Sequence, residues 1–332
     1  MADMPTPMGI FGALWGSGDR SRGTQWMQFL SRIAELINLS FSTEREAMFN
    51  YRLVKSEYAK GVHNITLEPL SAPAAHKPFC DAEVDNPTKL QALYLSQCVH
   101  SVILSTPLLA YLSSHCDIRV REYDIYIDPR VFTNCTNTST RNHDPLHSVL
   151  FVSPPFLPVT ATGSCPFKDP GMILDPSAHQ MGFEETFQCA ENYLSTKFNY
   201  RKKGHKSNPL GSHLNRFKVL FSPLSLYKNN PEFRHGISLR AICNVLYEEI
   251  ERMGEPRAVV SLEAAEWGRF FDALRVRLKR ELRQLRVQLD DVQFAVLRTE
   301  YAEDRGRELM NQDDKDGYRN MMALASDPYP QV

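Results

Sequence analysis

Apolar residues recur every three or four positions over much of the chain, which is the period of an amphipathic helix. The first such stretch predicts a helix that begins at Thr24 and continues to about residue 37. Thr43 and Glu46 have the spacing of a capping box, so we expect a second helix from there to Gly61. The two helices would form a hairpin at the start of the globular part.

The middle of the chain carries one long uncharged run, residues 90–115. The run is long enough to span a bilayer. Its glutamine, histidine and serine side chains would be costly in hydrocarbon, which favours a buried helix with a kink or break at Pro107. We therefore expect no transmembrane segment.

Strand-like patterns follow this run. Residues 118–127 and 148–153 are rich in β-branched and aromatic side chains and predict two strands, the first with a bulge near Arg121. Residues 154–182 contain many prolines and predict a long irregular segment. Further elements are expected as a short strand at 63–67, a helix at 182–194, a strand or turn pair at 217–226 and a helix at 238–254.

The last quarter of the chain changes character. After Ser261 about fifty residues contain no proline, and apolar residues form a heptad-like seam with one extra four-residue step. We expect a long helix over 261–311 that pairs with another chain, antiparallel because its first half is basic and its second half acidic. A helix packed on its own domain is the alternative. The seam residues are Trp267, Phe271, Leu274, Leu278, Leu282, Leu285, Leu289, Val292 and Val296.

These elements predict a helix-rich α+β protein, with a mixed globular body and a long C-terminal amphipathic or coiled-coil helix. The domain boundaries follow from the changes in pattern. We expect a flexible tail at 1–23, the α+β body at 24–256, the long helix at 261–311 and a polar tail at 312–332.

Composition bounds the function without deciding it. The chain has 332 residues, 23% charged and 42% hydrophobic, which excludes disorder throughout. A net charge of -1 excludes a uniformly basic polyanion binder but leaves room for a local basic patch. One basic segment with interleaved aromatic residues predicts binding of single-stranded nucleic acid or another polyanion, and a solvated loop is its alternative. Its cations are Lys197, Arg201, Lys202, Lys203, Lys206, Arg216 and Lys218.

Sequence motifs for catalysis and metal binding are missing. The chain has no nucleophile elbow, no P-loop and no H-E-x-x-H. Ser164 and Cys165 share a Gly/Pro turn, but no base can be assigned to them. Two Cys/His groups do not match the spacing of zinc sites, so we expect no metal and no cofactor. These groups are Cys135, His143 and His147, and Cys165, His179 and Cys189.

The expected function is therefore non-enzymatic, an assembly or scaffold subunit that pairs with itself or a protein partner through residues 261–311. A nucleic-acid-binding structural protein is the second hypothesis, and an enzyme without a recognisable motif is the third. Seven cysteines without a C-x-x-C pair and the absence of a secretory signal predict an intracellular protein, cytoplasmic or nuclear, that is not secreted.

Overall fold

The structure is a computed structural model, and the residues that it describes are 20–49, 51–59, 62–69, 85–95, 97–116, 118–135, 146–153, 171–199, 201–202, 205–217 and 231–303. Side chains are described in these ranges except at 20–25, 69, 217, 231–234 and 291–303. Within them the chain forms a helix-rich α+β fold, as the sequence predicts.

A five-stranded antiparallel sheet lies at the centre of the fold. Its order is β7-β6-β5-β3-β8. Strand β5 is buried on both faces, which explains its continuous apolar run. The strands are β3 (Arg119–Tyr126), β5 (Leu146–Ser153), β6 (Met172–Leu174), β7 (Phe187–Cys189) and β8 (Lys206–Pro209).

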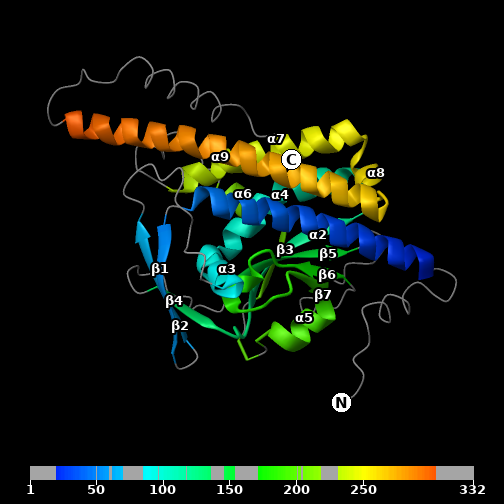
Figure 1. The fold of residues 1–332 in the computed structure, drawn as a ribbon. Helices are drawn as coiled ribbons and strands as arrows, with labels where there is room; N and C mark the ends of the chain where they lie inside the picture. The colour runs from blue at the N-terminus through cyan, green and yellow to red at the C-terminus, as the bar shows by residue number, and fades with distance from the viewer. Residues whose placement is uncertain are drawn as a thin grey trace.

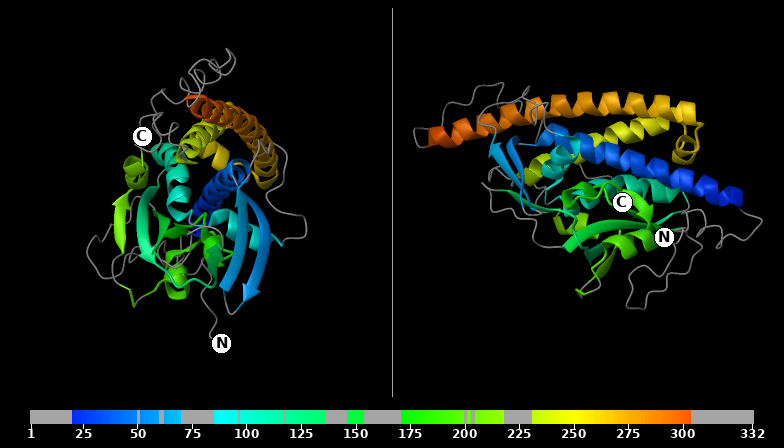
Figure 2. Two further views of the ribbon diagram at one scale, coloured as in Figure 1. Left: turned by 90° about the vertical axis from the view of Figure 1, so that its left-hand side faces the viewer. Right: turned by 60° about the horizontal axis from the view of Figure 1, so that its bottom comes forward.

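The two faces of this sheet are covered by different elements (Figures 1 and 2). Leu150 and Val152 of β5 pack into a core shared with the long helices. Val149 and Phe151 pack on the opposite face with residues of α5 (Ala190–Lys197) and the 3-10 helix η1 (Ala178–Met181). The helices of the first layer are α2 (Arg20–Met48), α4 (Cys98–His115), α7 (Pro231–Met253) and α9 (Ala264–Glu303), with the short helices α6 (Ser212–Phe217) and α8 (Pro256–Val260).

A second, three-stranded sheet stands beside the body (Figure 1). In it β1 (Tyr51–Ala59) pairs antiparallel with β2 (Val62–Pro69), which pairs in parallel with β4 (Phe132–Cys135). Helix α3 (Asn86–Tyr94) packs on this sheet. The buried residues of this small core are Leu53, Ile65, Leu67, Ala92, Leu95 and Cys135.

The predicted N-terminal helical hairpin is wrong. Helix α2 continues through Thr43 and Glu46 to Met48, and the segment expected to be the second helix is strand β1. From residue 24 to 48 the chain has no glycine or proline that would end the first helix. The short strand expected at 63–67 is confirmed by β2.

The uncharged run forms two helices instead of one. Helix α3 ends at Tyr94, and α4 begins at Cys98. Pro107 lies inside α4, so the break is not at the proline. No described helix is long and apolar enough to cross a bilayer alone, although α3 and α4 together satisfy that criterion of length and composition.

The predicted strands at 118–127 and 148–153 are confirmed by β3 and β5, but the bulge near Arg121 is wrong because β3 pairs with β5 in one unbroken register. The helix expected at 182–194 begins only at Ala190, after strand β7. The irregular segment expected at 154–182 contains β6 and η1 in its described part, 171–182. Residues 154–170 and 218–226 lie outside the described residues, as do the two predicted tails apart from residues 20–23, which begin α2.

The structure does not support a coiled-coil seam in the described part of α9. Seam residues from Trp267 to Leu289 are buried in the same core as α2 and α7, except Phe271, which is half-buried. Arg286 donates from Nη1 to the Ala47 carbonyl oxygen at 3.0 Å, which fixes the helix on the end of α2. The side chains of Val292 and Val296 lie outside the described part. A seam period cannot tell a partner helix from helices of the same chain, and here α2 and α7 supply the partner surface.

Candidate functional site

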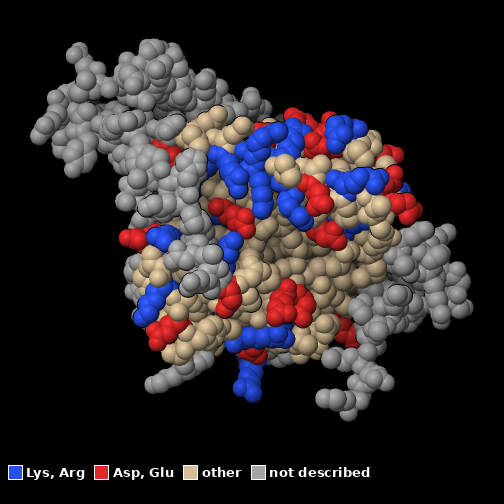
Figure 3. All heavy atoms as spheres, viewed as in Figure 1, with Lys and Arg blue, Asp and Glu red and all other residues tan. Residues whose placement is uncertain are grey.

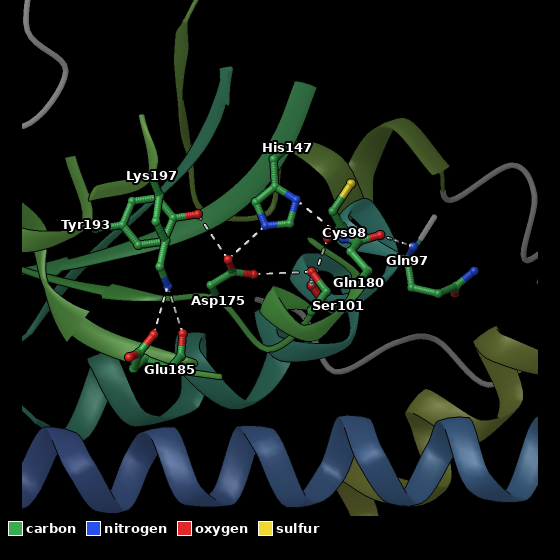
Figure 4. Close-up of polar contacts among 10 residues, drawn as sticks. Gln97, Cys98, Ser101, His147, Asp175, Gln180, Glu185, Tyr193 and Lys197 are labelled. Carbon is green, nitrogen blue, oxygen red and sulfur yellow. Dashed lines mark hydrogen bonds and ion pairs between the residues drawn. The ribbon is translucent and has the colours of Figure 1, made fainter. Parts of the chain in front are cut away.

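Three elements bring a cysteine, a histidine and a carboxylate together (Figure 4). Cys98 is the first residue of α4, His147 is the second residue of β5, and Asp175 directly follows β6. His147 Nε2 lies 2.8 Å from Asp175 Oδ2. The Cys98 thiol forms a hydrogen bond with the same imidazole. The histidine therefore stands between a thiol and a carboxylate.

Asp175 is held by several donors at once. The Tyr193 hydroxyl donates to its Oδ2 at 3.0 Å, and the Ser177 hydroxyl donates to its Oδ1 at 3.3 Å. His147, Asp175, Ser177 and Tyr193 are all buried. A buried carboxylate with this many partners keeps a fixed orientation, and so does the imidazole that donates to it.

The electrostatics favour a charged pair at Cys98 and His147. Burial opposes the charge on His147, but the adjacent Asp175 carboxylate outweighs it and raises the pKa of His147 to about 10. Burial would raise the pKa of Cys98, yet His147 and two backbone N–H groups, of Ser148 and Val99, lower it below its ordinary value. Burial would also raise the pKa of Asp175, and His147 lowers it instead. A thiolate beside an imidazolium is the reactive form of a nucleophilic cysteine.

The start of α4 adds a second source of positive potential. The first amides of a helix have no partner within the helix, and the helix dipole favours negative charge at that end. Cys98 stands at this position and is partly exposed, whereas the other described cysteines are buried. They are Cys116, Cys135, Cys189 and Cys243.

A buried amide completes the surroundings of the thiol. Gln180 Nε2 lies 3.3 Å from His147 Nδ1, and Gln180 Oε1 accepts from the Gln97 backbone N–H at 3.3 Å. Figure 4 shows Gln180 between His147 and Gln97, next to Cys98. Its side chain is thus placed where it can contact a group bound to the thiol.

The structure separates the cations of the predicted polyanion site. Lys197 is buried next to the triad, where Nζ donates to the Glu185 carbonyl oxygen at 3.1 Å and lies 4.5 Å from the centre of the Phe183 ring. Lys203 and Lys218 lie outside the described residues. Arg201, Lys202, Lys206 and Arg216 are exposed. Binding of a polyanion by these four remains a prediction.

Lys and Arg side chains also gather over α9 (Figure 3). Arg277 is not free among them, because it contacts Glu248 and donates to Glu249 Oε1 at 2.7 Å. The exposed cations of the helix include Arg269, Arg275, Lys279, Arg280 and Arg283. Most of the arginines thus face solvent, and some anchor the helix to its own body.

Sequence reasoning missed the triad because its members are far apart in the chain and belong to different elements. Its spacing along the chain associates His147 only with Cys135 and His143. Cys135 is buried in the second sheet's core, and His143 lies outside the described residues. The sequence carries no signal for Cys98, and for His147 only its place next to a predicted buried strand.

Comparisons with known proteins found no matching family model, no significant match among curated proteins and none among solved structures. The function is therefore argued from the site itself.

Proposed function

We propose that this protein is an enzyme in which Cys98 attacks an acyl group, so that it cleaves or transfers an amide, ester or thioester. The observation that carries the proposal is the placement of His147 between the Cys98 thiol and the Asp175 carboxylate, 2.8 Å from the latter. A nucleophile, a base and a group that orients the base are the parts required for acyl transfer through a covalent intermediate.

The reaction follows from these roles. The Cys98 thiolate attacks the carbonyl carbon, a carbon–sulfur bond forms, and the carbonyl electrons move to oxygen. The tetrahedral intermediate collapses as the leaving group departs with the proton of His147. Water or another acceptor then attacks the thioester while His147 takes its proton, and the thiolate is regenerated.

The negative oxygen of the intermediate needs donors that are already in place. The first-turn amides of α4 can supply them, since Cys98 begins that helix. The Gln180 amide can supply a further donor, because its Nε2 lies on the Nδ1 side of His147. Asp175 keeps the ring orientation and stabilises the imidazolium.

Acylation of the thiol by p-nitrophenyl acetate tests the proposal without knowledge of the natural substrate. We expect intact-mass measurement to show one acetyl group and peptide mapping to place it on Cys98. Cys98→Ser should remove this acetylation, and His147→Asn should slow it by about 100-fold or more.

His213→Asn is the matched control. His213 is also a buried histidine beside a carboxylate, with Nε2 2.9 Å from Asp124 Oδ1, but it lies in a different part of the sheet region, beside β3 and β8. This variant should acylate like the parent. Equal acylation rates for the parent and His147→Asn would show that the three residues form a structural polar network and no catalytic site.

A further inference from the structure

A second polar cluster joins three helices of the layer above the sheet. Glu44 comes from α2, His100 from α4 and His235 from α7. His235 Nδ1 lies 2.6 Å from Glu44 Oε1, and His100 Nε2 lies 3.3 Å from Glu44 Oε2. One ligand atom from each residue lies within 4.8 Å of the other two. The proposed thiol chemistry does not use this cluster.

The cluster has the chemistry of a metal site. Glu44 is fully buried, and the two histidine rings are partly buried, with their centres 4.0 Å apart. Two imidazoles and one carboxylate are a donor set that suits zinc and similar ions. Two imidazoles this close to each other and to a single carboxylate are readily explained by one cation that all three could share.

A supporting hydrogen bond orients the carboxylate. The Ser238 hydroxyl, which is buried, donates to Glu44 Oε1 at 3.0 Å. Side chains that ligate metals are commonly fixed in this way by a second layer of hydrogen bonds. Ser238 lies one turn after His235 on α7, so the same helix supplies a ligand and its support.

We propose that Glu44, His100 and His235 bind one divalent ion of the zinc class. Three protein ligands leave a fourth position for water or another small ligand. The ion would link α2, α4 and α7, and it would hold the first turn of the helix that begins at Cys98. The ion takes no part in the proposed acyl-transfer steps, and the test of this site does not depend on that activity.

The test uses the full chain, treated with EDTA, passed through gel filtration and then titrated with Zn²⁺ alone. Elemental analysis should find one more tightly bound Zn²⁺ per chain in the parent than in the variants that lack a ligand. We also expect a higher midpoint of thermal unfolding that EDTA reverses. His235→Asn and Glu44→Gln should weaken zinc binding at least tenfold, since loss of even an outer-shell partner costs about 10- to 100-fold.

His213→Asn again serves as the matched control, because His213 is buried beside Asp124 and Glu122 away from the cluster. It should retain the ion. Zinc retention by His235→Asn equal to that of the parent would overturn the proposal and assign the zinc to the cysteines or the surface. Should Glu44→Gln fail to fold, His235→Asn decides alone, because the His235 side chain is partly exposed whereas Glu44 is fully buried. Binding of Co²⁺ with a visible absorption band, absent in His235→Asn, gives a second readout.

Discussion

His147 and Asp175 are joined by a 2.8 Å contact between Nε2 and Oδ2, and neither side chain reaches solvent. This contact holds the ring that faces Cys98. It connects the reactivity of the thiol to a carboxylate in the segment that directly follows β6.

Asp175→Asn should slow alkylation of Cys98 by iodoacetamide at pH 7 by about 100-fold or more, because the ring loses the charge that keeps it protonated beside the thiolate. Peptide mapping measures the rate at Cys98 itself. Asp124→Asn, beside His213, is the control and should leave the rate unchanged. An Asp175→Asn protein that reacts like the parent would contradict the assigned role of the carboxylate.

The His147–Asp175 pair should also make stability depend on pH. The pKa of His147 is raised to about 10 when folded, above its ordinary value near 6.5 when unfolded. Its contribution is therefore fully present below about pH 6.5 and is lost as the pH rises toward about 10. The experiment needs the Cys98→Ser background, since the lowered pKa of the thiol acts in the opposite direction. In that background His147 lacks the share of the pKa rise that the thiol supplies, so urea unfolding should show a loss of about 1–3 kcal/mol that is complete below about pH 10.

His147→Asn in the same background should remove most of that pH dependence. A slope that persists in the double variant would assign the effect to other groups.

Leu282→Ala should destabilise the chain without changing its oligomeric state. The Leu282 side chain is fully buried where α9 packs on other helices of the same chain. Its truncation should therefore cost about 2–5 kcal/mol of unfolding free energy. Val276, on the same helix but 68% exposed, gives the control Val276→Ala, which should change stability by less than about 0.5 kcal/mol. Light scattering and urea unfolding measure both properties. A fall in mass on Leu282→Ala would instead support pairing through the seam.

Lys197→Met should lower stability and leave polyanion binding unaffected. The ammonium is buried, donates to the Glu185 carbonyl oxygen and lies over the Phe183 ring, so its loss leaves an acceptor without its donor and should cost about 1–3 kcal/mol. Elution from heparin should match the parent. Charge reversal at the exposed Arg201 and Lys202 is the change that tests polyanion binding by the predicted cations. Earlier elution of Lys197→Met from heparin would contradict the burial of the Lys197 ammonium.

Periodicity predicted the elements whose packing is local and missed those decided by distant segments. Strand β5 was predictable because its apolar run is buried whatever lies beside it. The residues of β1 have a helix-like spacing, yet they form a strand because β2 pairs with them from Tyr51 to Ala59, with one irregularity between Leu53 and Lys55. The period of the α9 seam predicts a buried face, but the sequence does not contain the identity of the surface that covers it.

The candidate site was less predictable than the fold. Cys98 lies within a run that reads as one helix, so nothing in the sequence marks it as the start of α4. His147 and Asp175 meet only because β5 and β6 are neighbours in the sheet, in the register that pairs Leu150 with Leu174. Registers of this kind are set by packing on both faces of a strand.

The contact between α2 and α9 has a consequence for biosynthesis. Both helices contribute to one core, but α9 is made more than two hundred residues after α2. During translation the part of the apolar face of α2 that packs on α9 stays uncovered until nearly the whole described chain has left the ribosome. The helical layer can finish packing only then. We expect nascent chains that stop after Pro256 to engage chaperones or aggregate, although every residue of the candidate thiol site has already been made.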